Sequence, residues 1–156
     1  MLDRLMARCQ PYAPLALRIM VAVIFIAHGA QKLFGIFGGY GIEGTAQFFE
    51  QLGINPGTFW AAIVGLIEFL GGIAVLLGLF TRYAATLLSI VMLVAIFKVH
   101  LPNGFFLPNG IEYAFAMLGA NVALLMGGAG EFSLDHYIKS LIERRRATGT
   151  ETAAKA

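Results

Sequence analysis

Apolar residues gather in four long runs along the chain, separated by short stretches rich in glycine, proline and charge. A helix that crosses a membrane needs about 20 mostly apolar residues, and each run comes close to that length. Pro14 suits the first position of a helix, and Asn55 suits the N-cap of the second run. The predicted spans run from about Pro14 to Phe37, Pro56 to Leu79, Arg82 to Leu101 and Gly110 to Met126.

The composition favours a membrane protein over a soluble domain. Of the 156 residues, 58% are hydrophobic and 13% are charged, and the mean hydropathy is +0.77. Soluble domains carry about a quarter of charged residues. A net charge of +2 without a basic and aromatic patch gives no indication of a nucleic-acid partner. Cys9 is the single cysteine, so any redox chemistry would come from a cofactor, a substrate or a partner protein.

Two further helices lie outside the four runs. A short helix over roughly Thr45 to Leu52 is expected at the outer interface. After the fourth run, Ser133 can cap a helix whose apolar residues fall at one face and which ends in three arginines. Such a helix fits the surface of an anionic cytoplasmic leaflet, and a fraying helix that only anchors the topology is the alternative. The apolar residues of this face are Leu134, Tyr137, Ile138, Leu141 and Ile142.

These elements predict an all-α membrane protein, a four-transmembrane-helix bundle with a short outer interfacial helix and a C-terminal amphipathic cytoplasmic helix. Residues 1–143 would form this one domain, and residues 144–156 a basic, disordered tail. If the spans alternate, basic residues concentrate on one side, and the positive-inside rule then places both termini in the cytoplasm. The basic residues of that side are Arg4, Arg8, Arg82, Lys139 and Arg144 to Arg146.

Two ionisable residues inside the spans are candidates for a buried polar site. Glu68 lies in the middle of the second span, and Arg18 lies four residues into the first. An ionisable group there costs about 2.5–3.5 kcal/mol on insertion scales, so it needs a partner or a cavity. Helix rise places the two residues about 6 Å apart in depth. We therefore expect an Arg18–Glu68 pair, which either locks the helices together or lines a polar pocket. Alternatively, Arg18 reaches the interface and leaves Glu68 protonated.

Further polar residues lie toward the outer ends of the spans. His28 and Lys32 share one face of the first span, and Lys32 is expected to reach outward. His100 ends the third span, and Glu112 opens the fourth, where Asn109 offers a capping explanation for it. No metal-ligand spacing is present, so we predict no metal site. The group suits a quinone headgroup, which needs proton-exchanging donors and an apolar slot. The candidates are Glu68, Arg18 and His28 for catalysis, and His28, Lys32, Glu68, His100 and Glu112 for cofactor binding.

Four segments together resemble the DoxX family of small bacterial inner-membrane proteins, over about residues 15–136. They read "LRIMVAVIFIAHGAQKLFG", "GTAQFFEQLGI", "GLIEFLGGIAVLLGLFTR" and "NGIEYAFAMLGANVALLMGGAGEFSLD". The resemblance implies a four-helix membrane bundle in the bacterial inner membrane. It also implies a link to quinone-dependent oxidoreductases, thiol-stress defence or membrane redox complexes.

Three functions remain open from the sequence. The first is a component of a quinone-linked redox system, with a membrane, periplasmic or cytoplasmic redox protein as partner. The second is a non-catalytic membrane anchor or assembly subunit. The third is a small-molecule carrier, for which four short-looped helices leave little room unless the protein forms a homo-oligomer.

Overall fold

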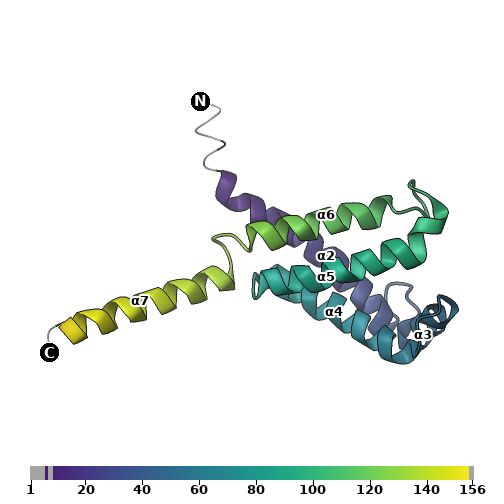
Figure 1. Cartoon of the computed structure of the whole chain (residues 1–156), viewed down its shortest axis with the longest axis horizontal. Helices are drawn as coiled ribbons and strands as arrows, with labels where there is room; N and C mark the ends of the chain where they lie inside the picture. Colours follow the sequence, from purple (N-terminus) through teal and green to yellow (C-terminus); the bar gives the residue numbers. More distant parts are fainter. Residues whose placement is uncertain (1–5, 7–8, 155–156) are drawn as a thin grey trace.

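The computed structural model describes residue 6 and residues 9–154, with side chains through Arg146. Every regular element within these residues is helical, which confirms the predicted all-α class. Four long helices, α2 (Ala13–Phe34), α4 (Gly57–Leu77), α5 (Thr81–Ala95) and α6 (Glu112–Gly127), run along one another (Figure 1). The short α3 (Gly41–Gln51) lies at one end of this bundle, and α7 (Leu134–Ala154) extends from the other. These ends are called the α3 end and the α7 end below.

Three helical segments are long and apolar enough to cross a membrane. They are Gln10–Phe34, Gly57–Leu77 and Thr81–Asn103, which agree with the first three predicted spans. The third combines α5 with a π-helical turn, Ile96–His100, and a 3-10 turn, Leu101–Asn103. The apolar α6 has 16 residues, or about 24 Å of helix, which is shorter than the roughly 30 Å hydrocarbon core. A fourth span therefore stays a prediction.

Glycines bring α2 and α4 into close antiparallel contact. A Cβ atom on Gly29 would collide with the backbone of Phe69. Farther along the same seam, Gly65 lies against Leu33 and Gly72 against Ile26. Small residues at a helix interface allow this approach in a membrane, where packing rather than hydrophobic burial drives association. The seam fixes the rotation and register of α2 against α4.

Substitution of Gly29 tests this seam. Gly29→Ala should lower the free energy of unfolding by about 1–3 kcal/mol, because the added methyl group must push the Phe69 backbone away. Gly119→Ala is the matched control, since a Cβ on this helical glycine meets nothing within 4 Å. Unfolding of both purified variants in detergent measures the difference. Equal stability of the two would contradict the close contact.

The α7 end is joined by a cap that involves three helices. Ser133 Oγ accepts a hydrogen bond from the His136 backbone N–H at 3.1 Å, which confirms the predicted cap of α7. The Asp135 carboxylate accepts hydrogen bonds from the backbone N–H groups of Phe80 and Thr81 at 2.7 and 3.0 Å. Asp135 also donates its own N–H to the Gly78 carbonyl at 2.8 Å. The start of α7 thus caps α5 and is fixed to the end of α4.

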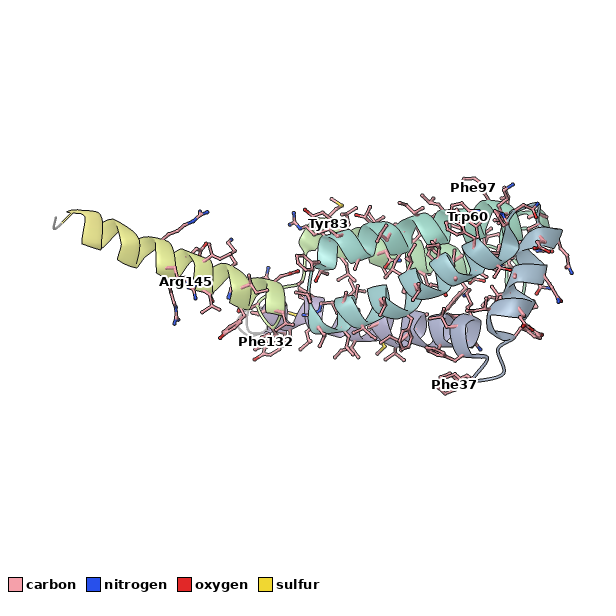
Figure 2. All side chains as sticks on the ribbon, turned by 90° about the horizontal axis from the view of Figure 1, so that it is seen from below. Phe37, Trp60, Tyr83, Phe97, Phe132 and Arg145 are labelled. Carbon is pink, nitrogen blue, oxygen red and sulfur yellow. The ribbon has the colours of Figure 1, made fainter. Side chains whose placement is uncertain are left out.

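Two expectations about helix ends are wrong. Pro56, not Asn55, occupies the N-cap of α4, and no side chain caps that end. The helix α7 continues through Ala154 and so includes most of the segment predicted as a disordered tail. Figure 2 shows α7 extending away from the bundle along its long axis, whereas the sequence predicts a helix lying across the membrane surface. Its first turn is attached to the bundle through hydrogen bonds of Asp135 to Gly78, Phe80 and Thr81.

Candidate ligand cavity

A cavity of about 380 Å³ lies between the helices in the half of the bundle toward the α3 end. This volume falls in the range of small-molecule sites, which are mostly apolar with a few convergent polar groups. Its polar side chains are His28, Lys32, Glu68, His100 and Tyr113. The apolar and aromatic remainder is Ile24, Phe25, Phe48, Phe49, Leu52, Ile54, Trp60, Ile63, Val64, Ile67, Ile90, Val91, Met92, Val94, Ala95, Val99, Ala114 and Met117.

Lys32 and Glu68 form an ion pair in the cavity wall. Lys32 Nζ donates to Glu68 Oε2 at 2.6 Å. The Glu68 side chain is 4% exposed and that of Lys32 is 23% exposed. A buried carboxylate needs a partner of this kind, because removing a charge from water costs several kcal/mol. The pair therefore places a proton donor and a proton acceptor side by side in an apolar wall.

The two histidines add imidazole rings, His28 from the same helix as Lys32 and His100 from the turn after α5. The His28 ring on α2 faces the Tyr113 ring on α6, with centroids 6.4 Å apart. His100 lies in the π-helical turn that follows α5, and its Nδ1 is 2.9 Å from the Asn109 carbonyl oxygen. Because a carbonyl oxygen only accepts, Nδ1 is the donor in this contact, and Nε2 is the ring nitrogen left for a ligand. The cavity thus holds acidic, basic and hydroxyl groups from four elements: α2, α4, the turn after α5, and α6.

The structure brings together four of the five predicted binding residues. His28, Lys32, Glu68 and His100 line the one cavity. Glu112 does not, because its carboxylate accepts a hydrogen bond from the Leu107 N–H at 3.1 Å and holds the loop before α6. Sequence reasoning missed Tyr113 and Trp60, which also line the cavity.

Arg18 takes no part in this cavity, and the predicted Arg18–Glu68 pair is wrong. Its guanidinium donates to four backbone carbonyls at 2.5–3.0 Å. Two acceptors, Val75 and Leu76, belong to the last turn of α4, where carbonyls lack the usual partner four residues on. The Val75 carbonyl also accepts from the Gly78 N–H at 3.1 Å. The other two, Ala129 and Phe132, belong to the loop between α6 and α7. Arg18 is 1% exposed and joins the two segments at the α7 end.

Side-chain direction explains this choice of partners. Side chains of an α-helix lean toward its N-terminus. On α2, Arg18 therefore leans toward the α7 end, while Lys32 leans from the α3 end back into the bundle. On the antiparallel α4, Glu68 leans toward the α3 end and meets Lys32. The expectation that Lys32 reaches outward is wrong for the same reason.

A polar groove adjoins the cavity beneath α3. Its lining includes Gln31, Tyr40, Thr45, Gln47 and Gln51. Lys32, Phe48 and Phe49 line both the groove and the cavity, so they form the wall between them. Lys32 is the ionisable member of this wall. The groove therefore borders Lys32, whose side chain is 23% exposed, and not Glu68.

The described residues contain no group of three or more His, Cys, Asp or Glu side chains that could hold a metal ion.

Comparison with known proteins identifies the family. The DoxX family model matches residues 13–101. The chain belongs to the DoxX family. It is 32% identical over 124 residues to the "Putative oxidoreductase CatD" of Bacillus subtilis, which covers 80% of this chain and 85% of CatD. It is 30% identical over 139 residues to the inner membrane protein YqjF of Escherichia coli, covering 85% of this chain and 97% of YqjF.

A third relative supports the same class. An uncharacterized membrane protein of Mycobacterium tuberculosis is 33% identical over 150 residues, which cover 89% of this chain and 87% of that protein. No solved structure matches the chain. This DoxX protein is therefore a membrane protein. The region that matches the family model contains Lys32, Glu68 and both candidate histidines.

Proposed function

We propose that this DoxX protein is the integral membrane component of a quinone-linked redox or thiol- and oxidative-stress system, and that the cavity binds the quinone headgroup. One observation carries the proposal. An apolar cavity of about 380 Å³ has an ion pair, two imidazoles and a phenol in its walls. A quinone likewise combines an apolar part, the edge of its ring, with two polar oxygens. The relative CatD, by its printed name, points to oxidoreductase chemistry.

Each polar residue has a distinct task in this proposal. A bound quinone would supply reversible two-electron, two-proton chemistry. The Lys32 ammonium would donate a hydrogen bond to one ring oxygen, and Glu68 would hold Lys32 in place and take up a proton. His100 Nε2 is available as an acceptor, and His28 or Tyr113 would hold the other oxygen. Water in the groove under α3 would exchange protons with Lys32.

Extraction of the purified protein tests the proposal. Solvent extraction and mass spectrometry should find quinone well above the amount carried by an unrelated four-span protein from the same membranes. Glu68→Gln should lose the excess, because it removes the anchor of Lys32. Glu43→Gln is the control on α3, outside the cavity lining. Quinone at the background level in the unsubstituted protein would count against a redox site.

We further propose four spans, with the α7 end in the cytoplasm of a bacterial cell. Described basic residues gather at this end, in Arg82, Lys139 and the segment Arg144 to Arg146. Acidic Glu43 and Glu50 lie on α3 at the opposite end. The positive-inside rule then places the groove on the outer side and both termini in the cytoplasm of the inner membrane.

A non-catalytic anchor or assembly subunit is the second candidate. The observation that favours it is α7, which projects from the bundle with its apolar residues Leu134, Tyr137, Ile138, Leu141 and Ile142 all at least 40% exposed. A redox partner protein or a second copy of the chain could pack on this face. If α7 is a docking helix, the cavity has no role in function. A substitution that fills the cavity would then leave the activity of the assembled complex unchanged.

A further inference from the structure

We infer that the cavity opens sideways to the lipid between α4 and α5, so that its ligand arrives dissolved in the bilayer and not from water. The inference deepens the proposed function by naming the ligand's source. It also names a class, a lipophilic molecule with one polar, proton-exchanging end and an aliphatic tail. The packing of α4 and α5 supports it.

The two helices are close at the α7 end and apart toward the α3 end. A three-residue link, Gly78 to Phe80, joins them. Two turns farther from this link, Gly71 of α4 lies against Leu88 of α5. Beyond that contact the facing residues line the cavity, among them Ile67 on α4 and Met92 on α5. Figure 1 shows α4 and α5 diverging toward the α3 end.

The rim of this gap is both cavity wall and outer surface. Trp60 on α4 and Ile90 and Val94 on α5 line the cavity, yet they are 41%, 51% and 46% exposed. Side chains that are buried inside a closed cavity would not reach the outside in this way. Figure 2 shows Trp60 on the outer face of the bundle, near the α3 end. All three rim side chains are apolar or aromatic, so the opening faces acyl chains.

Three of the five polar groups lie on helices that do not flank this opening, whereas Glu68 is on α4 and His100 follows α5. Lys32 and His28 come from α2, Tyr113 comes from α6, and Glu68 faces Lys32 at 2.6 Å. A ligand that enters between α4 and α5 would therefore point its polar end inward and leave its tail at the gap. Lys32, Phe48 and Phe49 stand between the cavity and the polar groove beneath α3, since they line both. That wall fits proton exchange better than passage of a ring.

Cysteine labelling tests the opening without any quinone. Cys9 is the single cysteine, so Cys9→Ser gives a clean background. Met117→Cys then places a thiol on α6 inside the cavity, where the native side chain is 6% exposed. The protein is reconstituted in phosphatidylcholine vesicles and treated with an N-alkyl maleimide delivered in the lipid, or with a charged, water-soluble maleimide. We expect the lipid-borne reagent to react faster.

Substitutions at the rim show the route. Val94→Phe and Ile90→Phe should slow the lipid-borne reaction at least about tenfold. Leu93→Phe is the matched control, because Leu93 is 41% exposed on the same helix and does not line the cavity. The inference is overturned if the charged reagent reacts faster or if all three variants react alike. The labelling experiment uses no quinone. Absence of quinone from the purified protein would therefore contradict the proposed function but not the lateral opening.

Discussion

Arg18→Met should be the most damaging single substitution in the chain, lowering the free energy of unfolding by about 3–5 kcal/mol or preventing accumulation in the membrane. The methionine keeps an apolar stem but removes the donors to Val75, Leu76, Ala129 and Phe132. Arg18 is 1% exposed, so the substitution removes four hydrogen bonds, two of them buried and two part-buried. Quantitative blotting of membranes and unfolding of the purified protein measure the effect.

Arg82→Met is the matched control for Arg18. Arg82 lies at the same end of the bundle, but it is exposed and makes one long hydrogen bond, 3.3 Å, to the Met126 carbonyl. Its loss should cost less than about 1 kcal/mol. A finding that the two variants are equally stable would contradict the role of Arg18 as the clamp between α4 and the loop before α7. Loss of quinone with unchanged stability in Arg18→Met would instead return Arg18 to the functional site.

Removal of one partner of the Lys32–Glu68 pair should lower the free energy of unfolding nearly as much as Arg18→Met does. Glu68→Leu leaves the Lys32 ammonium beside an apolar cavity, and removal of one partner of a buried pair typically costs about 3–5 kcal/mol. The double variant Lys32→Met with Glu68→Leu has no unpaired charge, so it should recover to within about 1 kcal/mol of the unsubstituted protein. The pair would then be retained for function and not for stability. A double-mutant cycle of unfolding free energies measures the coupling.

Two other results would contradict this account of the pair. If the double variant is as unstable as the sum of the two single variants, the residues act independently and the 2.6 Å contact carries no coupling. If Glu68→Leu alone is as stable as the unsubstituted protein, Lys32 finds water without Glu68. In that case water from the groove under α3 would solvate the Lys32 ammonium.

Sequence pattern predicted the helices well because hydrophobic runs report burial or lipid contact directly. The first three predicted spans agree with the structure, and the short helix after the first span begins at Gly41, slightly earlier than predicted. Ser133 caps α7 as expected. The Asn55 cap failed because Pro56 takes the cap position itself. Ends of helices depend on the path of the loop, which hydrophobicity does not specify.

The pairing of polar residues could not be predicted from depth. Arg18 and Glu68 are close in depth when each is counted from its own end of a span, but depth ignores where side chains point. Seven residues of α4, about 10 Å of helix, separate Glu68 from Val75, which accepts from Arg18. Both side chains lean away from each other, and Lys32 leans toward Glu68. The direction of Cα–Cβ bonds, together with antiparallel spans, was the signal available in the sequence.

Most of the polar residues of the cavity were predicted, but its full lining was not. His28, Lys32, Glu68 and His100 converge as the quinone hypothesis needs. Tyr113 and Trp60 were missed because membership depends on the rotation of each helix. For α2 and α4 that rotation is set by the Gly29–Phe69 contact. For His100 it is set by the π-helical turn, which shifts the face of the helix after Ala95.

The measurement that most directly tests the central claim uses Trp60, the single tryptophan of the chain and a wall of the cavity. The protein is placed in lipid nanodiscs, and its tryptophan fluorescence is followed during titration with a quinone that has an aliphatic tail. The account predicts a saturable component of quenching. That component should be lost in Ala114→Phe, which fills the cavity at a residue that is 2% exposed and leaves the ion pair intact. Quenching that rises linearly with quinone, and equally in Ala114→Phe, would show collision in the lipid alone and contradict a quinone site.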